Sequence, residues 1–230
     1  MEEKNSSDFE IVFEDTHFLV INKMSFLPVQ PGKAGKDSLL TRLKTDPRWE
    51  NLPLQVTQRI DQPVSGVVLF AKDQKGLSAF NKLLHNRQVV KRYWAVVTAD
   101  PGSSGYLVHY LLTDKKHNRS RAFSEPRPGS KKAELEFQTL IKFQRYWGIE
   151  VRLITGRQHQ IRAQMAAVNA PIKGDLKYGA ARSNPGGGIS LHARSLCFTH
   201  PFTGEEIVCT AAPPRGKEGM PDPLWSEFPA

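Results

Sequence analysis

The sequence has little cysteine, no long apolar run and no apolar N-terminal segment. Its 230 residues include two cysteines, Cys197 and Cys209, which do not form a Cys-x-x-Cys pair. A chain of this size does not need disulfides to fold, so we expect two free thiols in a reducing compartment. No run approaches the ~18 apolar residues of a membrane span. Residues 1–10 are polar and acidic and lack the apolar core of a secretory signal. We therefore expect a cytoplasmic protein that does not bind membranes.

Motifs for metal and nucleotide chemistry are also missing. The seven histidines and two cysteines do not have the spacing of zinc ligands. The chain has no phosphate-binding loop and no Gly-x-Ser-x-Gly elbow. We therefore expect no metal and no cofactor.

Acidic residues are outnumbered by basic ones. Thirty-two Lys and Arg against 23 Asp and Glu give a net charge of +9, which suits a polyanionic partner or serves solubility alone. The basic residues are spread along the chain rather than gathered on one amphipathic helix, which favours nucleic acid over a membrane surface. The most basic segment is residues 115–132, where Pro126, Pro128 and Gly129 predict a surface loop in the second half, and we treat the whole segment as a basic loop. This loop is either a solvated charged segment or a phosphate contact, with Lys115, Lys116, Arg119 and Arg121 as its candidate RNA-binding residues.

Hydrophobic patterns predict alternating strands and helices, and no Pro/Gly/Ser linker divides them. We expect a flexible tail over 1–8, one domain over 9–215 and a C-terminal tail over 216–230, in a monomer. Helices are predicted after a cap at Asp37 or Ser38, after a cap at Asp73, and from near residues 155–158. Strands are predicted near residues 9–13, 17–22, 67–71, 91–97, 106–112, 133–143, 147–154, 189–199 and 207–211.

One carboxylate stands in a turn-rich segment directly before an apolar strand. The segment reads Gln-Arg-Ile-Asp-Gln-Pro-Val-Ser-Gly over residues 58–66, followed by Val-Val-Leu-Phe-Ala. Pro63 restricts its own backbone and that of Gln62, and Gly66 permits a conformation or a close approach that a side chain would block. Asp61 is therefore held rigidly, either as a group with a chemical role or as an ordinary turn cap.

Three separated motifs resemble those of the RluA-type pseudouridine synthases. Residues 58–66 are similar to the family's H-R-L-D-x-x-T-S-G, with Gln58 in place of the usual His and Val64 in place of the usual Thr. Residues 91–97 are similar to K-x-Y-x-A-x-V, and residues 155–162 to T-G-R-x-H-Q-I-R. The likeness runs from about Val12 to Pro214, and we expect no N-terminal RNA-binding domain.

The resemblance implies the fold, the reaction and the site. The fold is the pseudouridine synthase fold, an α+β arrangement with a mixed, largely antiparallel sheet flanked by helices. The reaction converts uridine to pseudouridine in structured RNA, either rRNA or tRNA, without a cofactor. Asp61 would be the essential carboxylate, Tyr93 would lie against the flipped uracil, and Arg162 would be the ionic partner of the acid. Arg59 would fill the place of the flipped base. The remaining motif residues, expected to contact RNA or shape the pocket, are Arg157, His159 and Gln160.

Two other functions stay open at this point. The departures at Gln58 and Val64 allow a non-catalytic RNA-binding or ribosome-assembly protein that retains the synthase fold, although the presence of Asp61, Tyr93 and Arg162 together argues against it. A different carboxylate-dependent enzyme acting on nucleosides would be recognised by turnover of free uridine.

Overall fold

A computed structural model describes residues 9–32, 37–185, 187–214 and 223–229 of the chain. The tail predicted over residues 1–8 lies outside these ranges, as do residues 216–222 and 230 of the predicted C-terminal tail. The chain divides into two units, the first formed by residues 1–89 and 195–212, the second by residues 90–194 and 213–230. Strand β10 (Leu191–Thr199) begins in the second unit and ends in the first.

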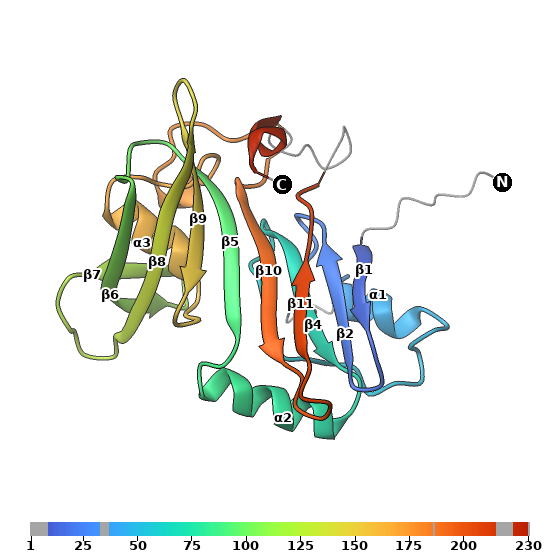
Figure 1. Cartoon of the computed structure of the whole chain (residues 1–230). Helices are drawn as coiled ribbons and strands as arrows, with labels where there is room; N and C mark the ends of the chain where they lie inside the picture. The colour runs from blue at the N-terminus through green and yellow to red at the C-terminus, as the bar shows by residue number, and fades with distance from the viewer. Residues whose placement is uncertain (1–8, 33–36, 186, 215–222, 230) are drawn as a thin grey trace. The chain divides into compact units, whose positions relative to one another are not determined.

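The first unit is built on antiparallel strands, seen in blue to cyan in Figure 1. β2 pairs with β1 on one side and with β4 on the other, and this places Lys23 opposite Gly66. Every residue of β2 and β4 is buried, as expected for strands covered on both faces. β3 pairs with β4, and β11 pairs with the end of β10. The bounds are β1 Phe9–Glu14, β2 Phe18–Lys23, β3 Gln55–Val56, β4 Ser65–Ala71 and β11 Glu206–Thr210.

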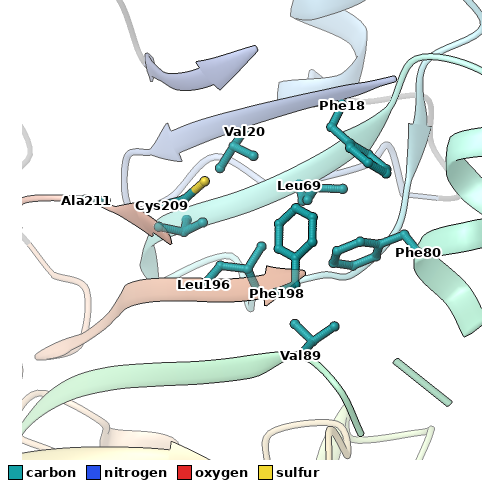
Figure 2. Packing of buried hydrophobic residues seen from close by; sticks show 10 residues of the cluster. Phe18, Val20, Leu69, Phe80, Val89, Leu196, Phe198, Cys209 and Ala211 are labelled. Carbon is teal, nitrogen blue, oxygen red and sulfur yellow. The ribbon is translucent and has the colours of Figure 1, made fainter. Parts of the chain in front are cut away.

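Two capped helices accompany these strands. Ser38 caps α1 (Leu39–Thr45) and forms a capping box with Thr41, while the Asp73 carboxylate caps α2 (Gln74–His85) by accepting from the Gly76 amide at 2.6 Å. Figure 2 shows the core beneath α2, where the rings of Phe18, Phe80 and Phe198 converge. Their centroids lie 5.2 to 5.9 Å apart in edge-to-face pairs, a favoured aromatic geometry.

The second unit is a sheet of antiparallel strands in the order β5-β9-β8-β6-β7. α3 packs on this sheet through Ala163, in a buried cluster with Leu111, Ala133 and Tyr178. The C-terminal turn η2 (Pro223–Glu227) leads to Phe228, whose ring lies 4.9 Å from that of Trp94. The other bounds are β5 Val90–Val97, β6 Ser104–Asp114, β7 Arg119–Phe123, β8 Lys131–Lys142, β9 Trp147–Leu153, α3 Gln160–Ala167 and η1 Leu176–Tyr178.

The α+β class and the largely antiparallel pairing are confirmed, and two local predictions are wrong. The basic segment 115–132 is not one loop, because Arg119–Phe123 form β7. The alternation of buried and exposed residues in this strand was not recognised in the sequence because the exposed residues are charged: Ser120 is buried between exposed Arg119 and Arg121. The third helix begins at Gln160 rather than near residues 155–158, because the preceding residues form a turn that ends in His159 with φ 52°.

The described residues contain no helix long and apolar enough to cross a membrane. Within the same ranges, no three side chains of His, Cys, Asp or Glu come together in a way that would hold a metal ion. Cys197 and Cys209 are both free thiols.

Candidate active site

Asp61 lies in a closed turn at the start of a buried strand. Its carbonyl accepts a hydrogen bond from the Val64 amide at 3.0 Å, which closes the turn around Gln62 and Pro63. Ile60 and Val64 are buried on either side of the half-buried Asp61. Two residues further on, Gly66 has φ 111°, a conformation that side chains disfavour. The carboxylate is thus carried by a turn that is anchored before and after it.

A second loop is fastened to this turn by a buried lysine. Lys23 ends β2 with no exposed surface, and its Nζ donates to the carbonyl oxygens of Met24 and Leu27, both at 2.8 Å. The same Nζ lies 3.4 Å from the Gln62 carbonyl oxygen. Phe26 adds two bonds, because its amide donates to the Gln62 carbonyl at 2.8 Å and its carbonyl accepts from Gln62 Nε2 at 2.9 Å. The two loops therefore form one hydrogen-bonded structure around Asp61.

The charge of Lys23 depends on this environment. Burial lowers the pKa of Lys23 from its usual 10.5 to about 7, and the negative charge of Asp61 partly opposes that fall. Lys23 is therefore a titratable group close enough to the candidate catalytic acid to interact with it electrostatically. Lys23 is not among the site residues predicted from sequence, although a lysine in register with the apolar run of β2 was a visible signal.

In the second unit, Arg162 is held by a buried carboxylate. Its Nε and Nη2 donate to the two oxygens of Asp175 at 2.6 and 2.9 Å, and both side chains are almost fully buried. The guanidinium also lies over the ring of Tyr178, 4.9 Å from its centroid. A guanidinium has five N–H donors, so the paired bonds to Asp175 fix its plane without using all of them. Asp175 is a second site residue that the sequence motifs did not predict.

The turn before α3 is built around the Gln160 side chain. Gln160 Oε1 accepts from the Thr155 hydroxyl at 2.8 Å and from the Arg157 amide at 2.9 Å, and Nε2 donates to the Glu134 carbonyl at 3.0 Å. His159 is buried too, with Nδ1 3.0 Å from the Tyr178 hydroxyl. Arg157 is the third residue of this motif that was expected to contact RNA or shape the pocket. Unlike His159, it is exposed, and its Nε donates to a carbonyl of β8 at 3.0 Å.

Tyr93 lies on β5, opposite Val151 of β9, and is partly buried. Lys91 is two residues earlier and so lies on the same face of the strand. Burial lowers the pKa of Lys91. Its Nζ lies 3.4 Å from the position that a β-carbon at Gly156 would occupy, so the second and third motifs meet within this unit.

The basic residues form a hairpin that is tied to the third motif. Lys115 and Lys116 lie in the turn between β6 and β7, and Arg119 and Arg121 follow in β7, all four exposed. Gln158 joins the hairpin to the motif: its Nε2 donates to Asn118 Oδ1, and its carbonyl accepts from the Ser120 hydroxyl, each at 2.7 Å. The Ser120 amide donates to the Tyr178 hydroxyl at 2.8 Å. The hairpin is thus fixed to the structure that holds Arg162.

The structure brings the predicted site residues together in two groups. Arg59, exposed, and Asp61 belong to the first unit, on either side of buried Ile60. The second unit contains the other predicted site residues, namely Tyr93, Arg157, His159, Gln160, Arg162 and the basic residues of the β6–β7 hairpin.

Comparison with known proteins identifies the class. Residues 17–167 match the family model described as RNA pseudouridylate synthase, and this range contains all the predicted site residues. The chain belongs to this family, which confirms the resemblance to RluA-type synthases.

Individual relatives cover most of the chain. It is similar to the ribosomal large subunit pseudouridine synthase D of Xylella fastidiosa, with 33% identity over 89% of this chain and 66% of the relative. It is also similar to the uncharacterized RNA pseudouridine synthase YlyB of Bacillus subtilis, with 33% identity over 90% of this chain and 70% of the relative. Among solved structures, human RNA pseudouridylate synthase domain containing 4 has a TM-score of 0.73 at 25% identity and covers 89% of this chain and 88% of its own. The chain thus spans about two thirds of the length of the first curated relative.

Proposed function

We propose that this chain converts uridine to pseudouridine at specific positions of a structured RNA, either rRNA or tRNA, with Asp61 as the essential carboxylate. The observation that carries the proposal is the anchored turn of Asp61, in a chain of the RNA pseudouridylate synthase family. The protein acts as a cytoplasmic monomer without a metal or a cofactor.

The reaction needs a fixed carboxylate and little else. The bond between the ribose C1′ and N1 of uracil breaks, the base turns, and C5 bonds to the same C1′. The proton on C5 is then lost and N1 gains one, so nothing is oxidised and no group leaves the RNA. Asp61 either attacks the ribose or removes a sugar proton, and both roles require an ionised carboxylate held against the sugar.

Arg162 and Tyr93 complete the catalytic group in this proposal. Arg162 is the counter-ion of Asp61, and the hydrogen bonds that it donates to Asp175 hold its guanidinium in one orientation before RNA binds. Tyr93 stacks on the flipped uracil, and its hydroxyl assists removal of the C5 proton.

Other residues bind the RNA and keep the target uridine out of its helix. Arg59 is exposed two residues before Asp61 and takes the place vacated by the flipped base, where a guanidinium both stacks and donates hydrogen bonds. The β6–β7 hairpin and Arg157 contact phosphates. His159 and Gln160 act indirectly: their bonds to Tyr178, Thr155 and Glu134 support the alternative that they shape the turn rather than touch RNA.

Mapping of pseudouridine in total cellular RNA tests the proposal. Cells with the wild-type gene, without it, and with Asp61→Ala are compared. We expect the same uridines to remain unmodified in the last two, and these positions identify the substrate. If no position changes while the purified protein still binds RNA, the catalytic proposal fails and the non-catalytic RNA-binding alternative replaces it.

A further inference from the structure

Phe26 has an unfavourable backbone conformation and an exposed ring. Its φ is 70°, in the left-handed region that costs free energy for a bulky L-residue. Its side chain is not covered in return, since Phe26 remains 41% exposed. Among the described residues, the ring has no aromatic or cation–π partner. Such outliers persist where the surrounding structure imposes them, and they gather at functional sites.

The surrounding bonds fix where this ring stands. Lys23 Nζ binds the carbonyls of Met24 and Leu27 on either side, and both backbone groups of Phe26 bond to Gln62. Gln62 directly follows Asp61. The backbone that carries the ring is therefore bonded to the residue next to the proposed catalytic acid, on a loop that is held before any ligand arrives.

The chemistry of the ring favours a nucleobase as its ligand. A base presents a flat π surface, and stacking on an exposed aromatic side chain is tolerant of sequence. The net charge of +9 also favours a polyanion.

We propose that Phe26 is a nucleobase-stacking residue, whose ring packs on a base adjacent to the uridine that enters the Asp61 site. This inference rests on the proposed function. It makes Phe26 a residue that positions the substrate RNA, while Asp61 carries the chemistry.

The test compares three replacements of Phe26 in the full chain. Phe26→Gly removes the ring and relieves the left-handed strain, Phe26→Leu removes only the aromatic surface, and Phe26→Trp keeps a stacking surface. The control is Phe202→Leu, which removes another exposed ring of the first unit, one that contacts the His17 ring in a tilted arrangement with centroids 4.1 Å apart. The substrate is total RNA from cells that lack the gene, and the thermal unfolding midpoint is measured for each variant.

We expect kcat/KM for pseudouridine formation to fall by about 5- to 150-fold in Phe26→Gly and Phe26→Leu, in line with the strength of base–aromatic stacking. Phe26→Trp should stay within about threefold of wild type, and Phe202→Leu should match wild type in activity. Phe26→Gly should keep an unfolding midpoint close to that of wild type, because relief of the left-handed strain offsets the lost apolar burial and the greater freedom of glycine in the unfolded chain. Lower activity with an unchanged unfolding midpoint excludes misfolding as the cause.

Two results would overturn the stacking role. One is wild-type activity of purified Phe26→Gly, which would assign the ring to a protein partner if the same variant lost modification in cells. The other is an equal loss in Phe26→Trp and Phe26→Leu. Failure of the proposed function itself would be visible separately, as unchanged activity in Asp61→Ala.

Discussion

Replacing Lys23 with methionine should change how the stability of the protein depends on pH. The pKa of Lys23 falls from 10.5 to about 7 on folding, chiefly through burial. Between these values the unfolded chain binds more protons than the folded one, so the free energy of unfolding rises with pH. Each pKa unit contributes about 1.4 kcal/mol, so the free energy of unfolding rises by roughly 5 kcal/mol between the folded and the unfolded pKa of Lys23. About 2.5 kcal/mol of this rise falls between pH 7.5 and 9.5.

Urea unfolding of wild type and Lys23→Met at pH 7.5 and 9.5 measures this contribution. We expect the wild-type free energy of unfolding minus that of the variant to increase by about 2.5 kcal/mol at the higher pH. Other titrating groups, including Cys209 with its pKa raised to about 11 by burial, are shared and cancel in the difference. Lys75→Met, which replaces an exposed lysine of α2, is the control and should give a difference that does not change with pH. A flat difference for Lys23→Met would refute the reasoning.

Two further predictions concern the second unit. Asp175→Asn leaves the Arg162 charge buried without its carboxylate, and it should lower the free energy of unfolding by about 3 to 5 kcal/mol and reduce kcat. Adding Arg162→Met should restore stability but not activity, and additive losses in urea unfolding would contradict the pairing. Replacing Lys115 and Lys116 with alanine should reduce the slope of log K against log salt for RNA binding by about 1.5. The matched pair Lys75→Ala and Lys82→Ala on α2 should leave the slope unchanged, and equal effects of the two pairs would exclude a phosphate contact at the hairpin.

Local structure was predictable where neighbouring residues determine it. The caps at Ser38 and Asp73 and the paired strands β1 and β2 follow from side-chain type and short-range pattern, and the structure confirms them. The unusual backbone conformation at Gly66 was also predictable, since its φ of 111° is one that glycine adopts easily. Strand β7 was hidden because its exposed arginines made the segment resemble a solvated loop.

The candidate site was predictable only in part. Motif resemblance selected Asp61, Tyr93 and Arg162, but it could not show what holds them. The bond between Arg162 and Asp175 joins residues 13 positions apart and depends on the turn between them. Phe26 gave no signal at all, because a left-handed φ is ordinarily marked by glycine or asparagine. Residues that support a site are less visible in sequence than residues that perform its chemistry.

The release of tritium from RNA labelled at C5 of uridine tests the central claim most directly, because isomerisation must free the hydrogen on C5. RNA from cells that lack the gene is incubated with purified wild type or Asp61→Asn, and RNA binding is measured alongside. We expect wild type to release tritium in proportion to the pseudouridine formed, and Asp61→Asn to bind RNA but release none. Release by Asp61→Asn at the wild-type rate would contradict the role of Asp61, and RNA binding by wild type without any release would contradict the enzyme itself.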